Sequence, residues 1–488
     1  MRTSISTSIE PRLLARVVFW LSLLCAGRGA SEQAPASPDH PWHSSVEKEF
    51  QSEGQSLRTS AFSIAPDKSY SLAALIDLAE MQNPETRFAW ERARAEAAAL
   101  GVAQSELYPA LAVTAISQLN RGLHFSGISI DRQTIQSFEG GLDLSYTVFD
   151  FGARASRISA AKAEVLAENF AFNDAHRRTI HDVEQAYYQL LNASGQLQAA
   201  EASLTNAQAV HQAAEDRLEH GLATLPDVLE AQSAEAQAEY ELQAVAGAED
   251  IARGNLAKAL GMLPTLRIHV QPLDQLATPE SLSDNVEKAL DRAFQQRPDL
   301  MQQLAEVRSA NARVKEAGVA FYPTLNLDAA AGGQALYASQ EAHRWVHSGN
   351  WVGGVGLSLT WSLFDGGLRK SKLARAKADV RASQATVNAA RDAIADEVWT
   401  AYSNLRTAFR QRQSASALLS AADQSYAASL DSYNHGVRNL LDVTAAQRRL
   451  AQARSSDVLA RTQVLASVAE LAFRTGDSIQ PTAKKSRP

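Results

Sequence analysis

Cysteine is almost absent from this sequence. The single thiol among 488 residues is Cys25, which lies in an apolar run at residues 17–26. Arginines precede this run and the small residues Gly27, Gly29 and Ala30 follow it, a pattern typical of a secretory signal peptide. We therefore expect residues 1–29 to be removed. The remaining chain then offers neither a disulfide nor a cysteine metal site.

Long apolar runs are also missing. The run at residues 17–26 is too short to cross a bilayer, which takes about 20 apolar residues, and no run of that length follows it. Only helices and closed barrels satisfy every backbone polar group in lipid. If the chain enters a membrane, we therefore expect it to do so as part of a closed β-barrel.

The chain carries fewer positive than negative side chains. The formal net charge is −7, and residues 1–29 carry four arginines against one glutamate, so their removal leaves the chain more acidic. Such a charge argues against nucleic acid as a partner. The sequence also lacks the motifs of a phosphate-binding loop, a catalytic triad or a metal site. It therefore predicts no enzyme activity, no cofactor and no bound metal.

What the sequence does contain is one unit written twice, 214 or 215 residues apart. A repeat of this kind defines the domain organisation. We expect a first repeat at residues 70–262, a linker at 263–283 and a second repeat at 284–476. Flexible segments are expected at residues 30–69 and 477–488. The paired landmarks are Asn83-Pro84-Glu85 with Arg297-Pro298-Asp299, Tyr108-Pro109 with Tyr322-Pro323, Phe149-Asp150 with Phe364-Asp365, His220-Gly221 with His435-Gly436, and Gly261 with Gly476.

Each copy contains a long stretch without proline, at residues 153–219 and 368–434. A helix of that length would extend for about 100 Å. Apolar residues recur seven apart at equivalent places in both stretches, which predicts a coiled-coil seam. The seam residues are Ile158, Val165 and Phe172 in the first copy and Leu373, Val380 and Val387 in the second.

Residues 109–149 and 323–364 have a different pattern. Apolar side chains alternate with small or polar ones there, as in Val355, Leu357 and Leu359. Alternation with glycine-rich joints predicts two hairpin strands per copy, each about ten residues long. Four strands cannot close a barrel, which needs about eight. Three copies of the chain would supply twelve, and cyclic symmetry would close them around a pore.

The His-Gly landmarks predict the ends of the long helices. Glycine supplies the left-handed conformation of a helix C-cap. Thr224 and Asn439 are suited to cap the helices that follow, and Pro226 fits a first helical turn. Each copy should therefore end in a helical hairpin whose tip points away from the strands.

This ordered pattern resembles the TolC family of outer-membrane efflux proteins, over about residues 70 to 476. The resemblance implies a mainly α fold with a small β part. In it, long antiparallel α-helical hairpins form a coiled-coil α-barrel in the periplasm, and four β-strands per protomer join a trimeric twelve-stranded barrel in the outer membrane of a Gram-negative cell. It also implies a passive exit duct of a tripartite efflux pump or a type I secretion system. The partners would be two further copies, a periplasmic adaptor (membrane fusion) protein, an inner-membrane transporter and outer-membrane lipid, with no cofactor.

In the family, an aspartate on the first hairpin and a tyrosine and an arginine on the second hold the periplasmic end shut. Aligned on the tip glycines, Asp227, Tyr433 and Arg438 take these places. Asp442 matches the first of two acidic rings at the entrance. The second ring falls at Ala445, and Glu230 on the other hairpin is a candidate replacement. The alternative interpretation is that Asp227 and Asp442 cap their helices and that Arg438 is a helix-end cation.

Apolar tip residues predict a docking surface for the adaptor. We expect Leu222, Leu225, Val437 and Leu440 to be exposed in an isolated protomer beside the tip glycines Gly221 and Gly436. Two other functions stay open at this stage, a periplasmic adaptor and a structural coiled-coil protein. The sequence does not identify the cargo.

Overall fold

The computed structural model describes residues 47–56, 69–126, 129–276, 285–340 and 345–477. The expected signal peptide and most of both terminal segments lie outside these residues. The chain divides into two units, residues 1–63 and 64–488. The described part of the first is helix α2 (Glu47–Ser56).

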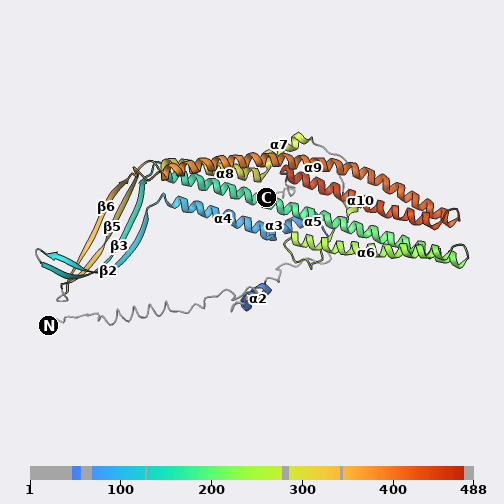
Figure 1. The fold of residues 1–488 in the computed structure, drawn as a ribbon, viewed down its shortest axis with the longest axis horizontal. Helices are drawn as coiled ribbons and strands as arrows, with labels where there is room; N and C mark the ends of the chain where they lie inside the picture. Colours follow the sequence, from blue (N-terminus) through green and yellow to red (C-terminus); the bar gives the residue numbers. More distant parts are fainter. Residues whose placement is uncertain (1–46, 57–68, 127–128, 277–284, 341–344, 478–488) are drawn as a thin grey trace, which may run out of the picture. The chain divides into compact units, whose positions relative to one another are not determined.

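The second unit contains the same order of elements twice, namely two helices, two strands, a long helix and its return helix (Figure 1). A parallel pair, β1 (Ser69–Tyr70) with β4 (His269–Val270), and helix η1 (Leu273–Gln275) lie outside this order. The mainly α fold with a small β part is confirmed. The first set is α3 (Leu72–Gln82), α4 (Pro84–Ser105), β2 (Ala110–Ser126), β3 (Ser129–Phe149), α5 (Ala153–Glu219) and α6 (Leu225–Ala259), and the second is α7 (Val286–Gln296), α8 (Pro298–Val319), β5 (Thr324–Gln340), β6 (Trp345–Thr360), α9 (Leu368–Asn434) and α10 (Leu440–Thr475).

The long helices α5 and α9 each contain 67 residues, and their bounds are those that the proline-free stretches predict. α6 packs on α5, α5 on α10, and α10 on α9. α6 and α9 therefore form the two edges of this layer. None of the described helices combines the length and the apolar composition that a membrane span requires.

Three clusters of buried side chains hold the helices together. The largest joins α3, α5 and α6 around Leu75, Tyr187 and Leu256. A second, near the hairpin tips, joins all four long helices. A third packs α7 and α8 on α9 around Ile394 and Val398. Small alanines occupy many of these positions, which allows close approach of the helix axes.

The four long strands form one antiparallel sheet in the order β2-β3-β5-β6. They contain 17, 21, 17 and 16 residues, so the prediction of about ten residues per strand was wrong. The glycine-rich segments that we interpreted as joints are part of the ladder, since Gly140 pairs with both Ala115 and Gly333. Glycine in a strand permits a bend without ending the pairing.

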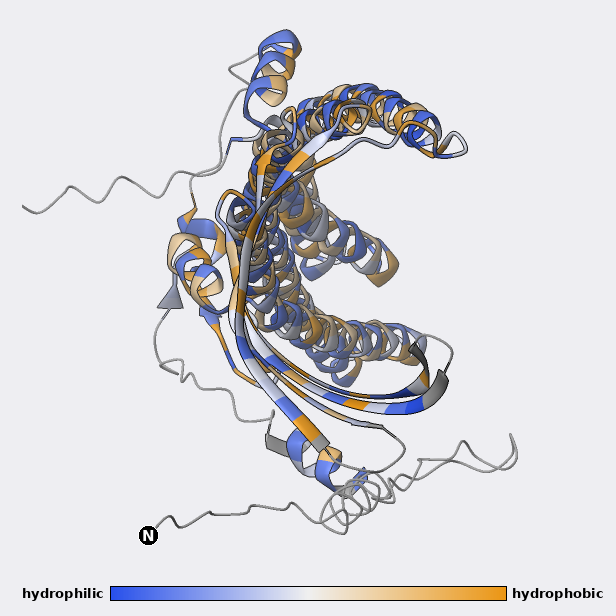
Figure 2. Cartoon of the chain, turned by 90° about the vertical axis from the view of Figure 1, so that its left-hand side faces the viewer, coloured by the Kyte–Doolittle hydropathy of each residue, from blue (hydrophilic) through white to orange (hydrophobic). Residues whose placement is uncertain are grey.

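The register gives the sheet two different faces. Paired residues share a face and neighbours along a strand alternate, so Val113, Leu142, Ala331 and Gly353 lie on one side. The opposite side carries polar residues, among them Thr114 and Asp143, whose side chains share a hydrogen bond of 2.5 Å. Figure 2 shows the alternating hydropathy along the strands. Exposed apolar side chains on the first face include Leu111, Val113, Leu142, Trp351, Val355, Leu357 and Leu359.

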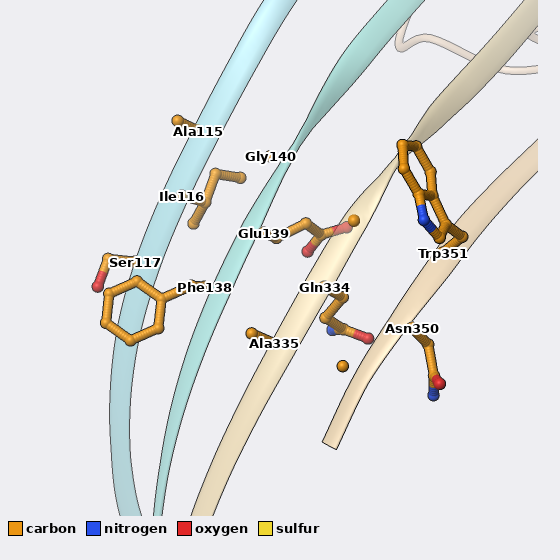
Figure 3. A pocket seen from close by; sticks show the side chains of 12 residues that line it. Ala115, Ile116, Ser117, Phe138, Glu139, Gly140, Gln334, Ala335, Asn350 and Trp351 are labelled. Carbon is orange, nitrogen blue, oxygen red and sulfur yellow. The ribbon is translucent and has the colours of Figure 1, made fainter. Parts of the chain in front are cut away.

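A band of glycines crosses this sheet. On the apolar face, small residues of the band leave a shallow hollow of about 700 Å³ between Phe138 of β3 and Trp351 of β6 (Figure 3). A Cβ atom added at Gly332 would lie 2.4 Å from the carbonyl oxygen of Gly140. The neighbouring Gly333 has no heavy atom within 4 Å of an added Cβ.

We predict that Gly332→Ala weakens the sheet and that Gly333→Ala does not. Strands β3 and β5 would have to separate to admit the new methyl group, at a cost of about 1–3 kcal/mol by analogy with overpacking. The thermal midpoint of the purified protein in detergent tests this difference. Equal midpoints for the two variants would contradict the close approach of β3 and β5.

Candidate gate at the hairpin tips

Both hairpins turn through the same backbone motif. The N–H of Leu222 donates to the carbonyl of Arg217 at 2.8 Å, and that of Gly221 donates to Leu218 at 2.9 Å. The second hairpin repeats this Schellman motif with Val437 and Gly436. The two glycines have φ values of +72° and +73°, which explains their recurrence at these positions. The predicted ends of the long helices are confirmed.

A buried cluster lies directly behind the two tips. Val210 of α5 and Val228 of α6 meet Tyr426 and Tyr433 of α9 and Leu450 of α10 there. The tips therefore extend from a packed core that both hairpins share.

Asp227 caps its own helix in this protomer. Its Oδ2 accepts hydrogen bonds from the backbone N–H of Thr224 at 2.9 Å and from the Thr224 hydroxyl at 2.7 Å. These hydrogen bonds hold the pKa of Asp227 below its usual value. The carboxylate is therefore ionised at neutral pH, whether it acts as a cap or also faces a partner.

Tyr433 is buried, with 5% of its surface exposed. Its hydroxyl has no hydrogen-bond partner among the described residues. Burial raises the pKa of Tyr433, the Arg217 charge opposes that rise and the Asp227 charge adds to it. The phenol is thus a neutral donor close to a carboxylate, without a direct bond to it in the protomer.

Arg217 is a tip residue that the sequence interpretation missed. Its guanidinium lies 4.6 Å from the centre of the Tyr433 ring. Its Nη1 donates to the carbonyls of Tyr433 at 3.0 Å and Asn434 at 3.3 Å. The sequence does show that Arg217 lies in the last turn of a helix, where a basic side chain often binds free carbonyls. It does not show that these carbonyls belong to the other hairpin.

Arg438 and Asp442 lie apart from this contact. Arg438 Nη1 is 3.4 Å from the Ser429 hydroxyl, and Asp442 is exposed with its backbone N–H bound by Asn439 at 3.0 Å. Within the described contacts of the protomer, neither side chain bonds to Asp227. The structure therefore brings Tyr433 together with Arg217 and leaves Arg438 and Asp442 at the surface.

The predicted docking residues divide into exposed and buried ones. Leu222, Leu225 and Val437 have 67%, 58% and 78% of their surface exposed. The prediction for Leu440 was wrong, because only 1% of this side chain is exposed. α10 packs between α9 and α5, so its first residue points into the shared core. The adjacent Leu441, with 58% exposed, is the apolar tip residue that sequence reasoning overlooked.

Glu230 lies on the wall of a groove of about 440 Å³ between α6 and α10, which Gln447 and Arg448 also line. Ala445, which takes the place of the second acidic ring, is half-buried. Across the described parts of the chain, no group of three or more histidine, cysteine, aspartate or glutamate side chains is placed to hold a metal ion.

Comparisons with known proteins agree with this architecture. A model of the outer membrane efflux protein family matches residues 75–262 and 289–477. Protein CyaE of Bordetella pertussis is 29% identical over 441 residues, covering 88% of this chain and 91% of that protein. Cation efflux system protein CusC of Escherichia coli K12 is 25% identical over 408 residues, covering 78% and 81%. The solved outer-membrane channel OprN superposes with a TM-score of 0.73 at 21% identity, over 84% of this chain and 91% of OprN, which shows a common fold.

Proposed function

The chain belongs to the outer membrane efflux protein family, and we propose from this premise that it forms the outer-membrane exit duct of a tripartite efflux pump or a type I secretion system. Its β-strands lie in the cell outer membrane and its helices in the periplasm. The duct conducts its cargo passively. It docks to a periplasmic adaptor and to an inner-membrane transporter, and the transporter supplies the energy for export. One observation carries this proposal: a sheet with one apolar and one polar face leads into long helical hairpins. The outer strands of the sheet and the outer helices of the helical layer have no neighbour on their free side within the described protomer.

The unpaired edges support a trimer. Strands β2 and β6 are the outer strands of the sheet, and an exposed edge calls for a partner strand. Three copies give twelve strands, enough to enclose a lumen. The apolar face would then meet lipid, and the polar face with Asp143 would line the duct.

The helical edges match in the same way. Tyr240 on α6 and Leu418 on α9 have 73% and 50% of their surface exposed. Both lie about 27 Å from the tip glycine of their hairpin, at 1.5 Å per residue. A rotation that joins β6 to β2 of the next copy can therefore join α9 to its α6.

The tips form the periplasmic gate and the docking surface in this proposal. Leu222, Leu225, Val437 and Leu441 contact the adaptor around the turns at Gly221 and Gly436. Arg438 closes the entrance against Asp227 of a neighbouring copy, Tyr433 supports the gate from within its own protomer, and Asp442 forms an acidic ring that favours cations. The exposed Arg438 and the ionised Asp227 support this pairing between copies.

We expect Tyr433→Phe combined with Arg438→Ser to raise the single-channel conductance severalfold. The double change removes the phenol donor and the cation that would hold Asp227, while the buried ring remains. Planar-bilayer recording of the purified protein measures the effect, with Arg391→Ser, in an exposed pair with Asp392, as a control. Unchanged conductance in a correctly assembled double variant would count against the gate.

Membrane fractionation tests the placement of the whole chain. A duct should stay in the outer-membrane fraction after a high-salt wash and leave it only with detergent. An adaptor or a coiled-coil scaffold held by surface charge would be released by salt, because salt screens exposed charges.

A further inference from the structure

We propose that Arg217 is a latch that joins the two hairpins of each protomer at the tip and positions Tyr433 for closure. This inference rests on the proposed gate at the same tips. It concerns a residue of α5 that the family pattern of aspartate, tyrosine and arginine does not include.

Arg217 reaches from the first hairpin to the end of the second. Its Nη1 donates to the last carbonyls of α9, on Tyr433 and Asn434, at 3.0 and 3.3 Å. The end of a helix carries partial negative charge and unsatisfied carbonyls, so a cation is stabilised there. One side chain thus completes the C-terminus of a helix that belongs to the other repeat.

The same guanidinium covers the face of the Tyr433 ring at 4.6 Å. Cation–π contact adds to the hydrogen bonds and fixes the orientation of the ring. The Nε atom of Arg217 has no partner among the described residues, and Nη1 makes both of its hydrogen bonds to α9. A single side chain, that of Arg217, therefore contacts both the backbone carbonyl and the ring of Tyr433.

The two halves of the chain are not equivalent at this position. The repeat register places Ser432 of α9 where Arg217 stands in α5. Serine is too short to return the contact to the end of α5. The latch therefore runs in one direction, from the first hairpin to the second, and movement of the α5 tip withdraws support from the Tyr433 ring and its backbone.

This arrangement assigns separate roles to the two arginines of the tip. Arg438 lies at the exposed surface beside Ser429, where a neighbouring copy can reach it. Arg217 acts within one protomer. Opening then requires that the Arg217 contact break together with the bonds between copies, and an adaptor that displaces Leu222 pulls on the turn that begins at the Arg217 carbonyl.

Arg217→Ala and Arg217→Gln test the latch in planar-bilayer recordings of the detergent-extracted protein. We expect both to raise conductance severalfold, because glutamine keeps most of the length but neither the charge nor the stacking. In a Tyr433→Ala background, Arg217→Ala should raise conductance less than it does in the wild type, since the ring contact is already lost there and only the hydrogen bonds to the two carbonyls remain to be broken. The exposed Arg381→Ala is the matched control.

Wild-type conductance in an Arg217→Gln protein of unchanged oligomer mass would overturn the latch. Full additivity with Tyr433→Ala would also overturn it, because it would show a merely structural role for Arg217. If the alanine variant does not assemble, the glutamine variant decides. A wild-type protein that does not conduct at all would instead refute the proposed duct, so the two failures are distinct.

Discussion

Replacement of Arg297 by methionine should cost about 3–5 kcal/mol of unfolding free energy, the usual penalty for removing one partner of a buried ion pair. Arg297 has 5% of its surface exposed. It holds Asp299 through two hydrogen bonds of 3.1 and 2.7 Å, and Glu397 of α9 through one of 2.7 Å. Methionine fills the space but removes the main cation of Asp299, which keeps only the more distant Arg177, and one of the two arginines on Glu397, which keeps Arg474 at 3.0 Å.

The electrostatics of this cluster support that expectation. Desolvation by burial raises the pKa of Asp299, but the hydrogen bonds and the charge of Arg297 outweigh this effect, so the pKa lies below its usual value. Arg177 adds a further positive charge, 3.8 Å from Asp299. Removal of Arg297 therefore leaves a large part of the desolvation cost of Asp299 uncompensated.

Denaturant titration of the purified protein, followed by helical circular dichroism, measures the loss. The control is Arg391→Met, because Arg391 and Asp392 form a pair that is mostly exposed and such pairs contribute about 0–1 kcal/mol. A loss at Arg297 no greater than that of the control would contradict the buried network.

Replacement of Glu184 by glutamine should remove a pH-dependent destabilisation of about 3 kcal/mol at pH 8 and above, from a shift of roughly 2.5 pKa units. Glu184 has 3% of its surface exposed, and its Oε1 lacks a partner among the described residues. Burial raises the pKa of Glu184 from 4.5 to about 7, with His181 opposing the rise. The ionised side chain therefore costs stability in the folded state.

The sign follows from proton binding. Between pH 4.5 and about 7 the folded protein holds a proton on Glu184 that the unfolded chain has released, so stability falls as the pH rises through this window. The unfolding free energy of the glutamine variant does not show this decrease. The difference in unfolding free energy between variant and wild type, measured at pH 4 and pH 8, isolates the effect from the packing of glutamine. A difference that does not change with pH would contradict the shift.

Much of the fold could be predicted because the repeat supplies each signal twice. The absence of proline and the paired His-Gly stops located both ends of α5 and α9. Alternating side chains located the strands, but not their lengths. Strand ends depend on cross-strand pairing at Gly140 and Gly333, which are distant in sequence, and single-strand patterns do not contain that information.

The site was harder to predict than the fold. The landmarks placed Asp227, Tyr433, Arg438 and Asp442 at the tips, where the structure has them. The burial of Leu440 was missed because α10 has two helical neighbours, whereas α6 packs mainly on one. The sequences of the two repeats are similar at the tips and do not reveal this difference. The Arg217 contact was missed because it joins the two repeats, whereas the repeat pattern describes each one alone.

The two arginine-centred contacts have different consequences for the account. Arg297 stabilises the middle of the helical layer, where three elements meet, and its loss should lower stability. Arg217 is half-buried at the tip, and its loss should alter opening far more than stability. Measuring both unfolding and conductance for the Arg297 and Arg217 variants therefore distinguishes residues that stabilise the duct from residues that control its opening.

The most direct test of the central claim is planar-bilayer conductance of the detergent-extracted protein, with the oligomer mass determined on the same sample. The account predicts a particle of three chains with a small conductance that favours cations. A monomeric particle, or a trimer that does not conduct, would contradict it.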